Sequence, residues 1–230
     1  MNPFAIGNRL FGLKKGSPQP PCLRGSAAII PATRFSWHVG LSKQLLPIRR
    51  RPAIRWVVKA ALDAGVERVV VVLGHRGREM KKALSGMPVL FAESREKNPN
   101  MAGFIRDGLY KVPPSVRGVF VLPCVQPLVQ PGTFRRLWEV FERDPDVIAV
   151  PVHQGSRRHP ALFSMRLAQK VFLGKNMGEV MREHSGRILQ VPVANEGAAL
   201  NMDAPPDYGE VRNAAETPSP KFPEQPAERL

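Results

Sequence analysis

Apolar residues at 119–122 stand together without polar alternation, and β-branched and aromatic side chains are among them. This pattern is typical of a strand that is buried on both faces of a sheet, so it predicts a central strand. Three prolines follow within ten residues and prevent regular structure until Thr133, which we expect to cap the next helix. Residues 124–126 should therefore lie at the carboxyl end of this strand, where open α/β sheets bind their ligands.

The same pattern of polar and apolar positions predicts an alternation of strands and helices along the chain. Apolar runs predict further strands at 27–30, 69–73, 89–92, 147–152 and 188–193. Apolar residues at helical spacing predict helices at 52–65, 79–84, 101–110, 134–141, 167–172 and 179–184, and a turn at 201–208 leads into a final short helix. The alternation predicts an α/β fold, namely a three-layer α/β/α arrangement around a mostly parallel, Rossmann-like sheet.

The ends of the chain differ in composition from this core. We expect a flexible basic arm at 1–25, one domain at 26–213 and a disordered tail at 214–230, which is rich in Pro and Glu. No apolar run is long enough to cross a bilayer. Cys22 and Cys124 lie far apart and suggest neither a disulfide framework nor a metal site, so we expect a cytoplasmic protein with no membrane partner. Cys124 is interpreted as a small buried hydrophobe, with a nucleophile as the alternative.

The charge of the chain is strongly basic and uneven. The formal net charge is +15, and no Asp or Glu precedes Asp63. Such a region should attract the phosphates of a nucleotide, a nucleic acid or a protein partner, although a well-solvated basic surface is the alternative. We interpret the arginine cluster at 49–51 as a solvated turn rather than as a nucleic-acid site.

The segment at 31–43 resembles the phosphate-binding loop of a known enzyme family. It reads Pro-Ala-Thr-Arg-Phe-Ser-Trp-His-Val-Gly-Leu-Ser-Lys and is followed by Leu-Leu-Pro. The MobA-like nucleotidyltransferases, which include the molybdenum cofactor cytidylyltransferases and guanylyltransferases, carry Leu-Ala-Ala-Gly-x-Ser-x-Arg-Met-Gly-x-x-Lys and then Leu-Leu-Pro. Ser36, Gly40 and Lys43 match this motif, whereas Arg34 replaces its Gly and His38 replaces its Arg.

Four later segments are similar to motifs of the same family. Residues 100–109 resemble Gly-Met-x-x-Ser-Leu-x-x-Gly-Leu, with Asn for the first Gly and Phe for Ser. Residues 122–127 resemble Leu-Pro-Gly-Asp-Gln-Pro, but Val125 replaces the Asp that binds magnesium in the family, and valine cannot ligate that ion. Residues 158–160 resemble Gly-His-Pro, which faces the acceptor, and residues 201–207 resemble Asp-Ile-Asp-Thr-Pro-Glu-Asp.

The resemblance covers nearly all of residues 27–212 and implies the fold of the nucleotide-diphospho-sugar transferases. It implies transfer of a nucleotidyl group from CTP or GTP to a phosphorylated acceptor such as the molybdopterin cofactor, with Mg²⁺ as cofactor and a molybdoenzyme as a further partner. The implied catalytic residues are Lys43 and His159, and the implied metal ligands are Asp203 and Asn201. The implied nucleotide-binding residues are Arg34, Ser36, His38, Gly40, Lys43, Met101 and Gln126.

Each of these roles has a simpler alternative. Lys43 could be one surface lysine among many, His159 a turn residue, and Asp203 a helix N-cap. Two hypotheses about function therefore remain: a nucleotidyltransferase with weakened or altered activity, and a catalytically inactive relative that binds a nucleotide or a partner. We expect weak transfer or none, because Val125 removes an oxygen and a negative charge from the metal position.

Overall fold

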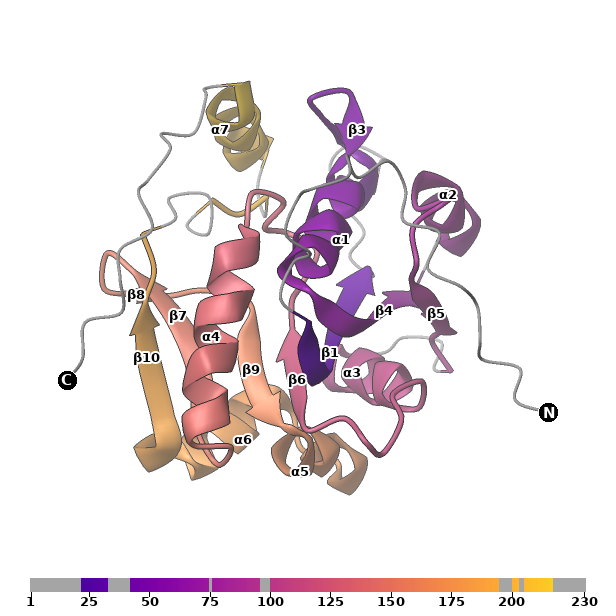
Figure 1. The fold of residues 1–230 in the computed structure, drawn as a ribbon. Coiled ribbons are helices and arrows are strands. Elements are labelled where there is room, and N and C mark those ends of the chain that lie inside the picture. Colours follow the sequence, from indigo (N-terminus) through magenta and orange to yellow (C-terminus); the bar gives the residue numbers. More distant parts are fainter. Residues whose placement is uncertain are drawn as a thin grey trace.

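The computed structural model describes residues 22–32, 42–74, 76–95, 100–194, 200–202 and 205–216. Its centre is an eight-stranded sheet in the order β10-β7-β9-β6-β1-β4-β5, with β8 paired to β7 (Figure 1). All strands on this path except β9 run parallel to one another. The strands are β1 (Leu23–Ala32), β4 (Val66–Leu73), β5 (Leu90–Glu93), β6 (Gly118–Val121), β7 (Ile148–His153), β8 (Ser156–Arg157), β9 (Ala161–Ser164) and β10 (Ile188–Pro192).

Helices cover both faces of the sheet, which confirms the predicted three-layer α/β/α fold (Figure 1). One face packs against α1 (Ala53–Ala64), α2 (Gly77–Ala83) and α4 (Pro131–Arg143). The other face packs against α3 (Met101–Leu109), α5 (Met165–Ala168), the 3₁₀ turn η2 (Gln169–Leu173) and α6 (Met177–Glu183). The remaining elements are η1 (Lys43–Leu45), η3 (Ser185–Arg187), α7 (Pro205–Glu216) and a small separate hairpin of β2 (Pro47–Ile48) and β3 (Arg51–Pro52).

The central strands are apolar over the stretches where both of their faces are covered, as in 27–32 of β1 and 69–73 of β4. In β6, Val119 and Val121 pack against the α3 side, whereas Phe120 packs against the α1 and α4 side. Phe120 meets the ring of Phe134 of α4 edge to face, with 5.2 Å between the ring centroids. The 119–122 run is thus a central strand, as predicted, although Leu122 lies just beyond its last paired residue.

The sequence predicted the limits of α1 correctly and the start of α4 wrongly. Helix α1 begins directly after Pro52 and ends at Gly65, whose φ of 91° suits a residue without a side chain. The expected cap at Thr133 is wrong, because α4 already begins at Pro131 with Gln130 as its N-cap. A proline fits the first helical position, where its fixed φ is favourable and its missing N–H costs nothing.

Elements at the two ends of the described chain pack into its core. Strand β1 already begins at Leu23, which is buried and whose N–H donates to the Gly65 carbonyl at 2.8 Å. Helix α7 continues to Glu216, and its Ala215 is buried in an apolar cluster. Each end thus buries an apolar side chain, and the division at residues 26 and 213 stays a prediction. The predicted arm and tail otherwise fall outside the described residues.

Asp146 joins two surface elements at the start of β7. Its carboxylate lies 2.6 Å from the Arg166 guanidinium of α5 and 3.1 Å from the Arg187 guanidinium of η3. The hydrogen bond and charge of Arg166, followed by those of Arg187, hold the pKa of Asp146 below its ordinary value.

Among the described residues no helix has the length and apolar character that a membrane span requires.

Candidate functional site

The carboxyl end of β6 and the segments around it form the candidate site. Strand β6 pairs in parallel with β1, and the Leu122 N–H donates to the Ile29 carbonyl at 3.1 Å, so the chain leaves both strands at the same edge. Strand β9 runs antiparallel to β6, with Ala161 opposite Val121. The start of β9 therefore lies at this edge too (Figure 1). His159 and the cis-bonded Pro160 directly precede β9 in the sequence.

Gln126 joins two of these segments through its side-chain amide. Its Nε2 donates to Asn201 Oδ1 at 2.7 Å, and its Oε1 accepts from the His159 N–H at 3.2 Å. The Gln126 side chain is almost fully buried, at 2% exposure. Next to it, the Met202 N–H donates to the Val125 carbonyl at 2.8 Å. The structure thus brings together three of the predicted site residues, Gln126, His159 and Asn201, from three distant parts of the sequence.

The described residues at this edge do not fit a divalent metal ion held by paired carboxylates. Val125 offers no side-chain oxygen and is 9% exposed. The Asn201 oxygen already accepts a hydrogen bond from the Gln126 amide, and its second lone pair offers a metal only one neutral ligand. The part of the chain that the structure describes contains no group of three or more His, Cys, Asp or Glu side chains able to hold a metal. Asp203, the other predicted ligand, lies outside the described residues.

Lys43 begins a segment that packs beside the chain bonded to Val125. It opens the η1 turn after the predicted phosphate loop, and Gln44 beside it is buried and accepts a hydrogen bond from the Ser42 hydroxyl. Leu46, three residues after Lys43, packs in the same apolar cluster as Met202, which is bonded to Val125. The predicted nucleotide-binding residues Arg34, Ser36, His38 and Gly40 lie outside the described residues.

The first turn of α3 places Met101 at its start, half-buried against the core. Asn100 is the N-cap, and its side chain accepts from the Gly103 N–H at 2.9 Å. The sequence interpretation treated Asn100 only as a replacement for glycine and missed this cap, although Asn is among the preferred N-cap residues. Phe104, at the position of the family's Ser, is 7% exposed and packs in the core.

Asp107 is a buried carboxylate that the sequence interpretation also missed. It lies on α3 at 3% exposure and accepts hydrogen bonds from the Ser94 hydroxyl at 3.2 Å and from the Arg95 N–H at 3.1 Å. It therefore ties the chain that leaves β5 to the helix. The sequence did contain a signal for this role, because Asp107 stands between apolar residues of an amphipathic helix and a buried charge needs a partner.

Cys124 behaves as the small hydrophobe that the sequence favoured. Its thiol is 2% exposed within the core that α1 and α4 cover. Burial raises the pKa of this thiol far above its ordinary value. A thiol that stays protonated at neutral pH is a poor nucleophile, so this arrangement does not favour the nucleophile alternative.

Comparison with known proteins places these features in a wider group. The model of the family described as "MobA-like NTP transferase domain" matches residues 29–186. A solved nucleotidyl transferase from Methanothermobacter thermautotroptrophicus superposes with a TM-score of 0.72 at 23% identity, covering 83% of this chain and 97% of that one. Molybdopterin-guanine dinucleotide biosynthesis protein A from Archaeoglobus fulgidus superposes with a TM-score of 0.61 at 16% identity, covering 82% and 97%. At these identities the two structures show a shared fold.

A curated relative matches a shorter stretch. The bifunctional protein GlmU of Thermus thermophilus is 40% identical over 57 residues. This match spans 25% of the present chain and only 13% of the length of that relative.

Proposed function

Because the chain belongs to the MobA-like NTP transferase domain family, we propose that it binds CTP or GTP at the carboxyl edge of its sheet and transfers the nucleotidyl group only weakly. The acceptor in this proposal is a phosphorylated molecule such as the molybdopterin cofactor, and a molybdoenzyme is the further partner. The A. fulgidus neighbour, named for molybdopterin-guanine dinucleotide biosynthesis, supports this choice of acceptor. Fold alone does not identify the substrate, so the proposal depends on the site residues.

The observation that carries the proposal is the hydrogen bonding of Gln126. Its amide joins the acceptor-side segment, through the His159 N–H, to Asn201 on the segment that precedes α7. In the proposed function these segments form the floor of the binding site, with Met101 at the side of the nucleotide. Lys43, together with Arg34, Ser36, His38 and Gly40, holds the triphosphate, and His159 faces the acceptor.

The proposed reaction is attack by an acceptor phosphate oxygen on the α-phosphate of the nucleoside triphosphate, with pyrophosphate as the leaving group. Negative charge on the phosphates has to be neutralised for this step, and positioned cations supply much of the rate of phosphoryl transfer. In this chain Lys43 and Arg34 are the cations proposed for that role. Val125 contributes no charge and no ligand, which supports a slow reaction.

A second candidate function is nucleotide or partner binding without transfer. Val125 favours it, because the side chain is apolar where the family places a metal-binding Asp. Buried Gln126 and Phe104 are compatible with an intact framework, so the loss of chemistry would not require a loss of the fold.

Pyrophosphate release distinguishes the two candidates. The assay compares wild type, Val125→Asp and Val125→Asn, with CTP or GTP, Mg²⁺ and candidate phosphorylated acceptors. If the protein transfers weakly, wild type should release pyrophosphate slowly and Val125→Asp at least about tenfold faster. Val125→Asn should change the rate little, because Asn has a size similar to Asp but no charge. Circular dichroism of each variant checks that the new polar side chain has not unfolded the protein. Fast wild-type release that Val125→Asp leaves unchanged would contradict the proposal, and release by neither folded form would favour the binding protein.

A further inference from the structure

The β2–β3 hairpin has an unusual turn. Pro47 pairs with Pro52 and Ile48 with Arg51, so only Arg49 and Arg50 form the turn. Their φ angles are 45° and 63°. A two-residue turn with positive φ at both positions favours Asn and Gly, because other side chains are disfavoured in the left-handed region. Two arginines therefore occupy positions where their backbone conformation is strained.

The strained turn is held firmly by the elements beneath it. The Ile48 carbonyl accepts from the Trp56 indole at 2.8 Å, and the Pro47 carbonyl accepts from the Tyr208 hydroxyl of α7 at 2.7 Å. Ile48 itself is fully buried in the cluster that contains Met202. Because α1 and α7 both hold the hairpin, the turn presents its side chains from a fixed base rather than from a loose loop.

The tip carries a dense positive charge. Arg49, Arg50 and Arg51 are all exposed, and they are consecutive in the sequence. The Arg51 guanidinium lies 6.0 Å from the centroid of the Trp56 ring, which favours an ordered orientation of this arginine. Figure 1 shows the hairpin at the end of the molecule, where it projects beyond α1. Three guanidinium groups on such a projection can reach into an acidic cleft of another molecule.

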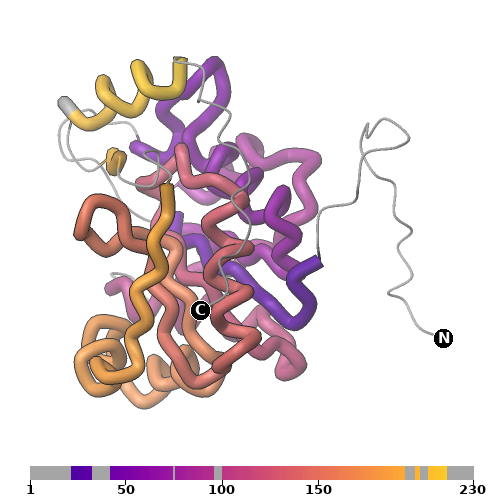
Figure 2. Tube along the Cα trace, turned by 60° about the vertical axis from the view of Figure 1, so that its left-hand side comes forward, coloured from indigo at the N-terminus to yellow at the C-terminus, as the bar shows by residue number. Residues whose placement is uncertain are grey.

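Helix α7 beside the hairpin restricts the kind of anion that fits. Tyr208 places α7 against Pro47, and the tube view shows the two segments as neighbours (Figure 2). Helix α7 exposes two glutamates, Glu210 and Glu216, but only one arginine, Arg212, among these side chains. It therefore adds more negative than positive charge beside the hairpin. A nucleic-acid backbone, with its regular phosphates, would meet these carboxylates, whereas a short acidic peptide segment can contact the tip alone.

We propose that the arginine tip, residues 49–51, is the docking point for a short acidic segment of a partner protein. Guanidinium groups pair with carboxylates through two parallel hydrogen bonds, which a rigid tip can offer with less loss of conformational freedom on binding. The strain at Arg49 and Arg50 is retained because glycine or asparagine would relieve it only by removing the charges that bind the partner.

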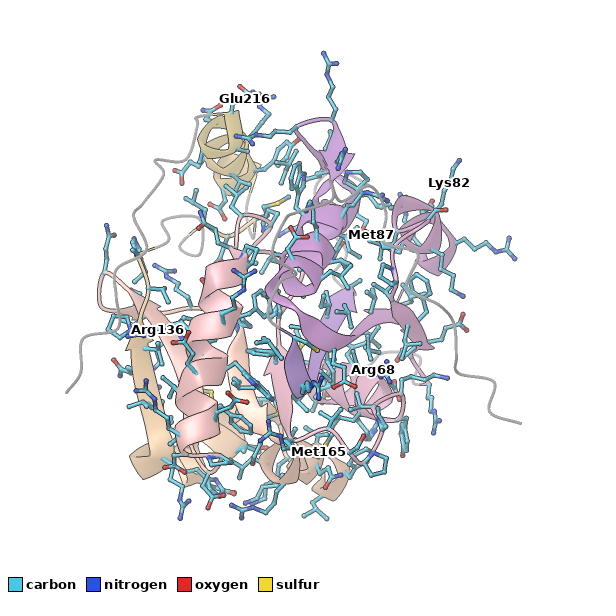
Figure 3. All side chains as sticks on the ribbon, viewed as in Figure 1. Arg68, Lys82, Met87, Arg136, Met165 and Glu216 are labelled. Atoms are coloured by element: carbon cyan, nitrogen blue, oxygen red, sulfur yellow. The ribbon has the colours of Figure 1, made fainter. Side chains whose placement is uncertain are left out.

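The test uses a fluorescently labelled decaglutamate peptide, polarisation at about 50 mM salt, and the double variant R49N/R50G. This variant suits the turn, so we expect its Tm to rise by roughly 2–4 °C or more while its affinity for the peptide falls at least about tenfold. The control is R68S/R136S, which removes the same charge from two exposed arginines away from the hairpin (Figure 3). We expect this control to bind the peptide with nearly wild-type affinity.

Three results would overturn the proposal. The first is undiminished peptide binding by R49N/R50G, and the second is an equal loss in the R68S/R136S control, which would indicate attraction by net charge alone. The third is tighter wild-type binding to a labelled 20-base-pair DNA duplex than to the peptide. Should R49N/R50G fold poorly, Arg51→Gln leaves the strained positions untouched, and it must also weaken peptide binding for the proposal to stand.

Discussion

Replacement of Gln126 by leucine removes both side-chain hydrogen bonds of the candidate site while keeping a similar volume. The bonds to Asn201 Oδ1 at 2.7 Å and from the His159 N–H at 3.2 Å are each worth about 0.5–1.5 kcal/mol net. Asn201 and His159 are only half-buried, so water can form hydrogen bonds with the groups that lose the Gln126 amide as a partner. We therefore expect Gln126→Leu to lower the free energy of unfolding by roughly 1–3 kcal/mol.

Urea denaturation followed by tryptophan fluorescence measures this loss, and a double-mutant cycle with Asn201→Leu isolates the direct contact. The coupling energy between the two positions should be about 1 kcal/mol, because the two side chains share one short hydrogen bond. A total loss under about 0.5 kcal/mol together with negligible coupling would refute the reasoning, since it would mean that the amide is as well satisfied by solvent as by these partners.

Three further predictions concern the core and the surface. Gly118→Ala would place a methyl group 2.7 Å from a ring carbon of Trp138, so thermal unfolding should show a loss of about 1–3 kcal/mol; an unchanged Tm would contradict this packing. Alkylation by iodoacetamide at pH 8, read by mass spectrometry, should modify exposed Cys22 at least about tenfold faster than buried Cys124, whose pKa is raised; equal rates in the folded protein would exclude that burial. Asp146→Asn should destabilise the protein slightly at pH 7, because a carboxyl with a lowered folded pKa stabilises the folded state above its unfolded pKa. The effect should shrink as the pH falls below the ordinary Asp pKa of 3.8 toward the folded pKa, and an effect that stays constant over this range would disprove the ion pairs.

Local patterns in the sequence predicted the layers of the fold. The apolar run at 119–122 and the Pro52 and Gly65 limits of α1 each depend on neighbouring residues, so they were readable from the chain alone. The predicted N-cap of α4, Thr133, was wrong because a second helix-start signal, Pro131, stands two residues earlier. The proline fits the first turn better.

Contacts between distant segments could not be predicted in the same way. The motif resemblance suggested that Gln126, His159 and Asn201 share a site, but it did not indicate that the Gln126 amide bonds to both of the others. The strain at Arg49 and Arg50 was also hidden, because an arginine-rich turn reads as a solvated loop until its φ angles are known. Backbone geometry and pairing across the sheet edge, rather than residue type, decide these features.

Titration calorimetry with CTP and GTP tests the central claim, nucleotide binding at the carboxyl edge, most directly. The measurement compares wild type with Lys43→Met and with the control Lys59→Met, whose lysine pairs with Asp63 on the surface of α1. We predict one bound nucleotide per chain. Lys43→Met should weaken nucleotide affinity roughly tenfold or more, because it removes a charged contact to phosphate, and the control should leave Kd unchanged. Absence of binding to either nucleotide, or equal affinity in Lys43→Met and wild type, would contradict the account.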